Sequence, residues 1–429
     1  MKLTLAFDKT GAGIELPPAR NVTVLEPRFA SELPSADDAL ADALRAPIRS
    51  PPLAELARGK KSAAISVCDI TRPAPNRTVL PHVTAALEAG GIPRSGIRIL
   101  IATGLHREAT AAELDEIVGP EMLASYEVRS HHAKAEDEQS FLGETKSGTQ
   151  VYIDKRFIEA DLHITLGFVE PHLMAGFSGG RKLISIGLAG EKTIKRLHSP
   201  HFMRMPDVTE GVFPDNALHR ELLEIAAMAR HDFMVDVALT RTRGIAAVFA
   251  GEPRAAHAAG VDFVRESTLA SVPEPADLVI TTSGGYPLDL TFYQAVKGIT
   301  AASHVVKPGG TILLVAACRE GIGSPEFTEM VRNSPDWRQL LDDLSNAPVT
   351  VDQWQAEKLA MVARKANLAF CLPGISNQDR QHMWGPCYDT PQQAVDATVA
   401  QLGRGASIVA IPEGPYVFSQ LEPELAAAI

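Results

Sequence analysis

The sequence predicts an α/β protein with two domains whose β-sheets are mostly parallel. Its 429 residues exceed what one hydrophobic core usually supports, which favours two domains of roughly 150 to 250 residues each. Apolar β-rich runs alternate with helical stretches, the pattern of a parallel sheet covered on both faces. Hydrophobic residues make up 45% and charged residues 22%. This ordinary globular composition excludes disordered, fibrous and coiled-coil chains.

Seven apolar runs predict the strands in chain order. They span residues 62–68, 97–104, 160–169, 276–285, 310–318, 367–374 and 407–414. The stretch "ESTLASVPEPADLV" carries two prolines directly before a new strand. We therefore expect an N-terminal α/β domain over residues 1–270 and a C-terminal α/β domain over residues 271–429. Because small-molecule pockets often lie at domain interfaces, we expect the active site in the cleft between them.

Charge and cysteine content narrow the possible functions. A net charge of -11, without a run of like charges, excludes an electrostatic footprint for nucleic acid. The start "MKLTLAFDKT" is charged too early for a secretory signal, and no 18-residue apolar run occurs, so we expect a cytoplasmic protein without a membrane partner. The four cysteines show no CxxC spacing, which favours reduced thiols over disulfides or a thiolate metal site.

Polar residues follow three of the predicted strands. Asp69 follows the first, His106 the second and His172 the third. Thr110 and Glu113 have the spacing of a capping box, which makes "GLHREA" the loop between a strand and a helix. In open α/β sheets ligands bind beyond the carboxyl ends of the strands. We expect the three residues to reach one rim.

The segment "GFSGGRK" (176–182) resembles a phosphate-binding loop but departs from the Walker A motif. Arg181 and Leu183 occupy the places where that motif has glycine and a hydroxyl residue, which excludes an ordinary NTPase. The stretch "GAGIEL" lacks the third glycine of a dinucleotide fingerprint, so a standard NAD fold is unsupported.

The glycine pair leaves two interpretations open. The backbone N–H groups of Ser178, Gly179 and Gly180, helped by the Arg181 side chain, suit an anionic group such as a phosphate. A tight turn that simply needs glycine explains the same residues.

Lys182 and His198 also have two interpretations each. Lys182 could neutralise charge or anchor a cofactor covalently, as lysine does in Schiff-base enzymes, and a solvated lysine is the simpler alternative. His198, in "KRLHSP", could cap a helix C-terminus or bind a metal ion. We expect His131 and His132 to lie in a solvated loop and His163 to pack inside a strand.

Six segments together resemble the nickel-dependent lactate racemase family. They are "DITRPAP" (69–75), "GLHREAT" (104–110), "EPHLMAGFSGGRK" (170–182), "LHSP" (197–200), "GGYPLDLTFYQAVKG" (284–298) and "DQWQAEKLA" (352–360). They are spread from about residue 69 to residue 360 in the family's order, so the resemblance covers most of the chain. One departure is Ile186, because the family has a proline before the glycine at this point.

The resemblance implies a nickel-pincer nucleotide, pyridinium-3,5-bisthiocarboxylic acid mononucleotide nickel, as the cofactor. By the same resemblance Lys182 is its covalent anchor, His198 is the protein ligand to nickel, and His106 and His172 are the two acid/base histidines. The implied cofactor-binding residues also include Asp69, Thr71, Arg72, Ser178, Gly179 and Gly180. The implied substrate-binding residues are Arg72, Tyr293, Gln294, Lys297 and Trp354.

The implied activity is a racemase or epimerase that inverts C2 of a small 2-hydroxy acid by hydride transfer through a 2-keto acid. Cofactor-biosynthesis proteins are the implied partners. The same chemistry on a longer sugar acid or hydroxy dicarboxylate is an alternative. Two further alternatives are a pyridoxal-phosphate enzyme with Lys182 as Schiff base and a noncatalytic binding protein. A conventional NAD-dependent oxidoreductase is disfavoured by the missing fingerprint.

Overall fold

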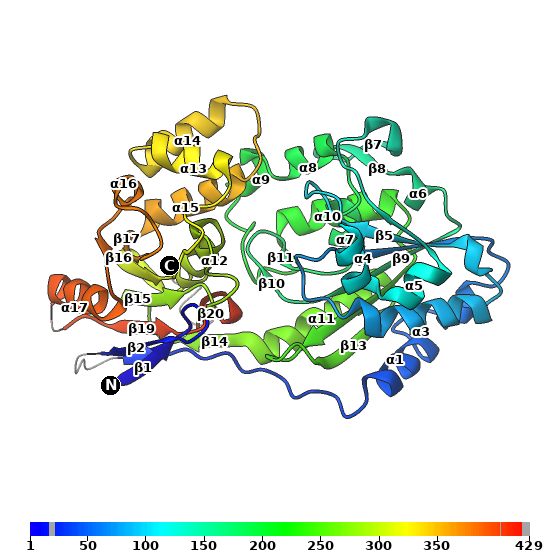
Figure 1. Cartoon of the computed structure of the whole chain (residues 1–429), viewed down its shortest axis with the longest axis horizontal. Helices are drawn as coiled ribbons and strands as arrows, with labels where there is room; N and C mark the ends of the chain where they lie inside the picture. Colours follow the sequence, from blue (N-terminus) through cyan, green and yellow to red (C-terminus); the bar gives the residue numbers. More distant parts are fainter. Residues whose placement is uncertain (17–21, 404, 423–429) are drawn as a thin grey trace. The chain divides into compact units, whose positions relative to one another are not determined.

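The computed structural model describes residues 1–16, 22–403 and 405–422, which divide into two compact units (Figure 1). The first unit comprises Met1–Arg28, His198–Met205 and Thr268–Ile429, and the second comprises Phe29–Leu197 and Pro206–Ser267. The last segment of the first unit begins at Thr268, close to the boundary expected at residue 270. The sequence interpretation did not include the two earlier segments, which join the first unit through tertiary contacts.

The second unit is built on a six-stranded sheet in the order β13-β12-β9-β4-β5-β6. Its strands are β4 (Ala63–Cys68), β5 (Ile97–Ala102), β6 (Glu127–Ser130), β9 (Leu162–Phe168), β12 (Phe233–Leu239) and β13 (Ile245–Gly251). All neighbours pair in parallel except β12 with β13. Side chains of β4 and β9 are buried along both strands, as expected where both faces of a parallel sheet are covered.

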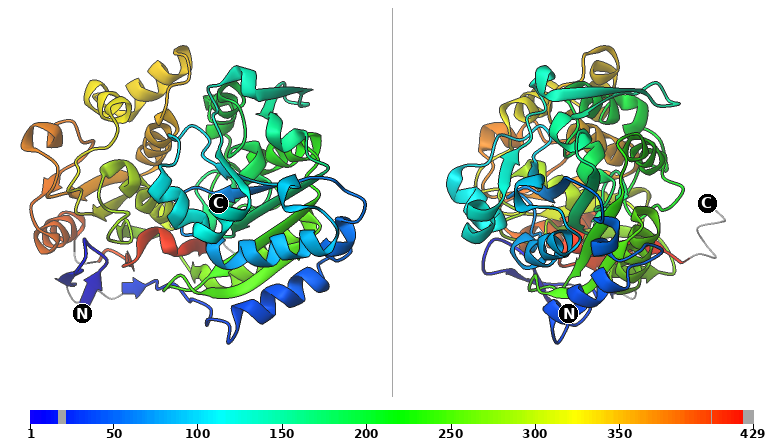
Figure 2. Two further views of the ribbon diagram at one scale, coloured as in Figure 1. Left: turned by 45° about the vertical axis from the view of Figure 1, so that its right-hand side comes forward. Right: turned by 90° about the vertical axis from the view of Figure 1, so that its right-hand side faces the viewer.

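Helices cover the two faces of this sheet through alternate side chains of the same strands. Val237 of β12 belongs to the core packed by α1 (Ala36–Arg45) and α3 (Asn76–Ala89). Its neighbour Ala238 belongs to the core packed by α11 (Pro253–Thr268). Figure 2 shows the blue helices α1 and α3 running beside the green strands.

The remaining elements of the second unit are short helices and hairpins around the sheet. They are α2 (Leu53–Leu56), α4 (Ala111–Val118), α5 (Pro120–Ser125), β7 (Gln139–Glu144), β8 (Gln150–Asp154), α6 (Lys155–Ile158), β10 (Pro171–His172), β11 (Gly176–Phe177), α7 (Lys182–Ser185), α8 (Glu191–Leu197) and α10 (Ala217–Met228). Antiparallel pairing of β10 with β11 turns the chain between His172 and Gly176.

The first unit contains a wholly parallel six-stranded sheet in the order β18-β17-β16-β15-β19-β3. Its strands are β3 (Val22–Val24), β15 (Ala276–Thr282), β16 (Val306–Val315), β17 (Asn367–Cys371), β18 (Cys387–Tyr388) and β19 (Ile408–Ile411). The edge strand β3 comes from the N-terminal part of the chain and pairs with β19. This pairing explains why the first residues of the chain belong to this unit.

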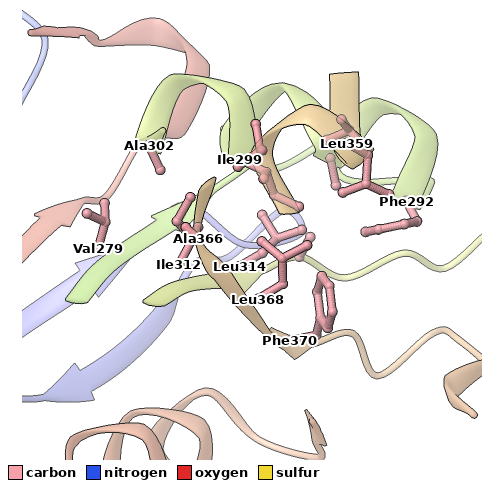
Figure 3. Close-up of a cluster of buried hydrophobic side chains, with 14 of the residues drawn as sticks. Val279, Phe292, Ile299, Ala302, Ile312, Leu314, Leu359, Ala366, Leu368 and Phe370 are labelled. Atoms are coloured by element: carbon pink, nitrogen blue, oxygen red, sulfur yellow. The ribbon is translucent and has the colours of Figure 1, made fainter. Parts of the chain in front are cut away.

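One face of this sheet packs against α12 (Phe292–Ala302) and α15 (Gln353–Lys365). Figure 3 shows this core, in which Phe292, Ile299 and Leu359 of the helices meet strand residues such as Leu314 and Phe370. Truncating a fully buried aromatic side chain such as Phe292 to alanine would cost about 3–5 kcal/mol.

The opposite face packs against the hairpin of β1 (Lys2–Leu5) and β2 (Ala12–Glu15) and against α17 (Pro391–Leu402). The other elements of this unit are α9 (Pro200–Met203), β14 (Leu269–Val272), α13 (Pro325–Asn333), α14 (Trp337–Asn346), α16 (Asn377–Arg380) and β20 (Phe418–Leu421).

The predicted fold class is confirmed, since both units are α/β with mostly parallel sheets. Each of the seven predicted runs contains a strand. Strands β3, β6, β12, β13 and β18 of the two six-stranded sheets were not predicted. The runs of β3, β6 and β18 are short, and Asp236 interrupts that of β12, whereas the apolar run of β13, "IAAVFAG", was overlooked. The four cysteines carry free thiols. In the described parts of the chain, none of the helices has the length and apolar character that a membrane span requires.

Candidate active site

The order of strands in the second unit places a topological switch point between β4 and β9. The chain runs from β4 outward through β5 to β6 and later returns to β9 on the other side of β4. At such a reversal the loops beyond the two strands diverge, and ligands bind in the opening at the carboxyl ends. The Ser66 hydroxyl of β4 donates to the carbonyl of Leu183 at 3.1 Å, which fixes α7 at this position.

The rim after β4 and β5 carries a carboxylate–imidazole pair. His106 Nδ1 lies 2.7 Å from Asp69 Oδ2, and the other oxygen of Asp69 accepts the Thr71 hydroxyl at 2.6 Å. Burial opposes ionisation of Asp69, but the hydrogen bonds from His106 and Thr71 lower the pKa of this carboxyl below its ordinary value. An ionised Asp69 keeps the proton of a neutral His106 on Nδ1 and leaves Nε2 available for acid/base chemistry.

Asp69 and His106 differ in solvent exposure, which indicates different roles for the two side chains. The Asp69 side chain is 8% exposed, whereas the His106 side chain is 54% exposed. Asp69 is thus positioned to orient the ring, and His106 to meet a ligand. Thr71 and Arg72 are exposed in the same loop, and an Arg72 Nη donates to the Thr71 hydroxyl at 3.3 Å.

A second pair lies after β9. Lys182 Nζ lies 2.6 Å from His172 Nε2. Burial and the neighbouring charges of Arg72 and Arg181 lower the pKa of Lys182 to about 7, although the carboxylate of Glu170 acts in the opposite direction. A lysine with such a pKa is partly a neutral amine at physiological pH, the form that attacks an electrophile.

The glycine loop before Lys182 is held from inside the protein. Gly180 N–H donates to Asp236 Oδ2 at 2.8 Å, and Ser178 N–H donates to the carbonyl of Glu170 at 2.9 Å. Two of the three N–H groups predicted to face a phosphate therefore already have protein partners. Burial raises the pKa of Asp236 to about 7, against the Gly180 hydrogen bond and the charge of Arg181. Phosphate binding by this loop stays a prediction.

Glycine is required at position 179 for two reasons. Its φ of +84° is left-handed, and a Cβ there would lie 2.2 Å from Asp236 Oδ2. The tight turn by itself therefore explains the glycine at this position, and this explanation does not depend on a ligand.

The expectation that Arg181 faces an anion is wrong. Its side chain is 2% exposed, and the guanidinium donates to the carbonyls of Ala175 and Phe177 at 3.0 and 2.9 Å. A further nitrogen of Arg181 lies 2.6 Å from His257 Nε2, and burial lowers the pKa of His257 so that its ring stays neutral. Arg181 thus shapes the segment that presents Lys182.

His198 lies between α8 and α9 and belongs to the first unit. The residue is 7% exposed, and its ring centroid lies 4.6 Å from that of Trp354 on α15. Beyond it, Lys358 donates to the carbonyl of Met203 at 3.0 Å and Arg204 forms an ion pair with Glu357. These contacts explain why His198–Met205 belongs to the first unit, although the residues before and after it in sequence belong to the second.

The other predicted substrate-side residues lie on α12, as their spacing predicts. Tyr293, Gln294 and Lys297 are each partly exposed. Gln355 of α15 donates to the carbonyl of Tyr293 at 2.9 Å, which links α12 to the helix that carries Trp354.

The candidate residues therefore form two sets. Asp69, Thr71, Arg72, His106, His172, Ser178, Gly179, Gly180 and Lys182 belong to the second unit, whereas His198, Tyr293, Gln294, Lys297 and Trp354 belong to the first. Within residues 1–16, 22–403 and 405–422, no three His, Cys, Asp or Glu side chains form a group suited to a metal ion.

One residue of this region was missed by the sequence interpretation. Asp236 holds the glycine loop, and its signal was a carboxylate inside the otherwise apolar run "FMVDVAL". The prediction for His131 is also wrong. This residue is 1% exposed, and its ring lies 2.9 Å from Asp154 Oδ2 and 2.9 Å from the carbonyl of Ala189. His163 is buried within β9, as predicted, with Nδ1 2.7 Å from Asp232 Oδ2.

Comparison with known proteins identifies relatives along almost the whole chain. Residues 7–211 match the lactate racemase N-terminal domain, and residues 272–418 match the lactate racemase C-terminal domain. The lactate racemase of Lactiplantibacillus plantarum is 36% identical over 384 residues, covering 89% of this chain and 90% of that protein. The lactate racemase of Thermoanaerobacterium thermosaccharolyticum is 34% identical over 365 residues, covering 84% and 85%.

Solved structures with a similar fold include a member of the same family. The lactate racemase apoprotein from Thermoanaerobacterium thermosaccharolyticum superposes with a TM-score of 0.92 at 30% identity, covering 98% of this chain and 100% of that one. A Thermotoga maritima protein shares the fold, with a TM-score of 0.65 at 14% identity over 92% of this chain and 100% of that one.

The fold and these relatives define the protein as an enzyme of the isomerase class. The chain belongs to the lactate racemase family. The resemblance found in the six sequence segments is thereby confirmed.

Proposed function

We propose that this enzyme inverts C2 of a small 2-hydroxy carboxylic acid, with lactate as the first candidate, by hydride transfer involving a lysine-tethered nickel-pincer nucleotide. The observation that carries the proposal is the Lys182–His172 contact of 2.6 Å in a unit that also presents the Asp69–His106 pair. The family is generally nickel-dependent, and the curated relatives are lactate racemases.

The residues present fit such a cofactor. A lysine whose pKa is lowered to about 7 suits a covalent anchor, and an imidazole such as that of His198 suits nickel. Thr71 and Arg72, exposed after β4, supply donors for the nucleotide phosphate, with Asp69 orienting Thr71. Softer sulfur donors would come from the nucleotide itself. When bound, such a group would supply hydride-acceptor and hydride-donor chemistry.

The two histidines supply the proton chemistry. Removing the α-hydrogen of a 2-hydroxy carboxylate as a proton would create a carbanion beside a negative charge, whereas its loss as a hydride avoids that species. One histidine then takes the hydroxyl proton, and the substrate becomes a planar 2-keto acid. A proton from the other histidine completes the inverted product after the ketone has turned. Each positioned histidine should contribute about 10²- to 10⁴-fold.

Two cations are proposed to hold the substrate carboxylate. The guanidinium of Arg72 suits bidentate contact, and Lys297 offers a point charge. Tyr293, Gln294 and Trp354 would line the same pocket. We also retain the predictions that the enzyme works in the cytoplasm and depends on separate cofactor-biosynthesis proteins.

The first test measures intact mass and nickel on protein co-produced with the cofactor-making enzymes. We expect an added mass of a few hundred daltons and about one nickel per chain, both lost in Lys182→Ala. Absorbance near the visible edge without nickel would support a pyridoxal-phosphate enzyme instead. With the cofactor established, inversion of lactate, a sugar acid and a hydroxy dicarboxylate would be compared by chiral chromatography. Failure on all three, with cofactor loaded, would contradict the proposed activity.

A further inference from the structure

The imidazole of His172 is held by backbone groups on one side and meets Lys182 on the other. The N–H groups of Met174 and Ala175 donate to His172 Nδ1 at 3.3 and 3.2 Å. On the far side of the ring, Nε2 lies 2.6 Å from Lys182 Nζ. The turn between β10 and β11 creates this arrangement, because it folds residues 174 and 175 back over the ring.

These contacts determine which nitrogen carries the proton. A nitrogen that accepts two N–H groups cannot itself be protonated, so Nδ1 is the acceptor and the proton of the neutral ring sits on Nε2. Nε2–H is therefore a donor toward Lys182. An ammonium group has three donors and no acceptor, so a protonated Lys182 would place donor against donor. Only the neutral amine, with its lone pair, completes the hydrogen bond.

Charged groups from each neighbouring segment act on the same lysine. Burial, Arg72 after β4 and Arg181 beside it disfavour the ammonium form, whereas Glu170 after β9 and Cys68 at the end of β4 favour it. The first set prevails, since the pKa of Lys182 falls to about 7. Burial raises the pKa of the Cys68 thiol to about 12, so Cys68 remains a thiol and adds no negative charge near neutral pH.

We propose that His172 holds Lys182 as a neutral, nucleophilic amine in the protein without its cofactor. His172 thus prepares the lysine for covalent attachment, in addition to the proton transfer assigned to it above. The inference rests on the proposed function for the identity of Lys182 as the attachment point. The state of the amine itself can be measured without any cofactor.

The test is acetylation of the cofactor-free protein by acetic anhydride across pH 5 to 11. The Lys182 nitrogen attacks one carbonyl carbon, the C–O bond to the leaving acetate breaks, and the lost proton passes to buffer, leaving an acetamide. Peptide mass spectrometry reports the rate at each lysine. We expect half-maximal reactivity of Lys182 near pH 7, while Lys192, whose side chain is 57% exposed and whose pKa the hydrogen bond to Glu136 raises, should react only at higher pH. A Lys182 profile that coincides with that of Lys192 would overturn the proposal.

His172→Ala isolates the contribution of the imidazole. Water that enters the vacated space can accept a hydrogen bond from an ammonium group, which Nε2–H cannot, so the Lys182 midpoint should move up by at least one pH unit. Reactivity at pH 7 should fall about fivefold or more and recover at pH 11, where the amine is neutral in both proteins. Loss at every pH would mean that His172 has only a structural role, and an unchanged midpoint would show that burial alone suffices.

His132→Ala provides the matched control, because His132 is a partly exposed histidine of the same unit whose ring pairs with Glu138. It should leave the Lys182 profile unchanged. Cofactor loading then separates this inference from the proposed function. A mass adduct on wild-type Lys182 together with an unshifted His172→Ala profile would refute the inference alone. The expected shift with no adduct would refute the proposed function alone.

Discussion

The imidazole of His106 and the carboxylate of Asp69 form a hydrogen-bonded pair, with Nδ1 2.7 Å from Oδ2, across 37 positions of sequence. Parallel pairing of β4 with β5 brings their carboxyl ends together, so each residue reaches the other from its own strand end. The buried carboxylate orients a largely exposed ring. This is the geometry that a positioned acid/base histidine needs.

Asp69→Asn should lower turnover by about 10²-fold with a much smaller change in KM, because the amide no longer selects the ring orientation and tautomer of His106. Racemisation of lactate by cofactor-loaded protein, followed by chiral chromatography, measures both constants. Asp232→Asn is the matched control, since Asp232 forms an equivalent 2.7 Å contact with His163 that has no proposed role in the reaction. Equal turnover in the two variants would contradict the assignment.

Asp236→Asn should change how stability depends on pH. Burial raises the pKa of Asp236 from 3.8 to about 7, so the folded protein binds a proton that the unfolded chain has released between these values. Wild-type stability should therefore fall as pH rises from 4 to 7, and this decline should flatten in the variant. Above pH 7 the variant should be more stable by about 1 kcal/mol or more. Urea unfolding at pH 5, 7 and 8.5 checks the sign.

Gly179→Ala should destabilise the second unit by about 2 kcal/mol or more, because it combines a left-handed φ with a Cβ that would lie 2.2 Å from Asp236 Oδ2. Gly148→Ala separates the two causes. Gly148 has a φ of +80° but no heavy atom within 4 Å of the added Cβ, so only the backbone cost of about 1 kcal/mol remains. Similar melting temperatures for the two variants would mean that the loop relaxes away from Asp236.

Lys297→Ala should raise the apparent KM for the hydroxy acid and lower turnover, because the substrate carboxylate loses a point charge. Steady-state kinetics on the loaded enzyme provide the measurement. Lys307→Ala removes a comparable lysine of the same unit whose ammonium group pairs with Asp277, and it should behave as wild type. Wild-type kinetics in Lys297→Ala would exclude this lysine from the site.

Trp354→Ala should reduce the nickel retained per chain after dialysis, because the ring that packs 4.6 Å from His198 restricts the orientation of the proposed ligand. Trp354→Phe keeps an aromatic ring at this position and should retain most of the metal. Metal analysis of the two variants and of wild-type protein makes the comparison. Equal nickel content in all three would show that His198 is oriented without Trp354.

Local sequence patterns were sufficient to predict many strands, one helix cap and the family of this protein. The seven apolar runs identified seven strands of the two six-stranded sheets, because strands buried on both faces are rich in apolar residues. The Thr110–Glu113 capping box was confirmed, since its hydrogen bonds join residues three apart. The motifs around Lys182 and His172 indicated the family, because a motif consists of residue types at a given spacing and both can be read directly from the sequence.

Only the tertiary structure decided the contacts between distant segments. The burial of Arg181, the support of the glycine loop by Asp236 and the grouping of His198 with α15 depend on partners 56 to 156 positions away. A motif describes the chemistry that a residue can perform. Burial and hydrogen-bond partners decide its charge, tautomer and direction, and these follow from long-range packing that no local pattern records. For this reason the sequence by itself predicted Lys182 as the cofactor anchor, whereas the structure showed that His172 faces its amine.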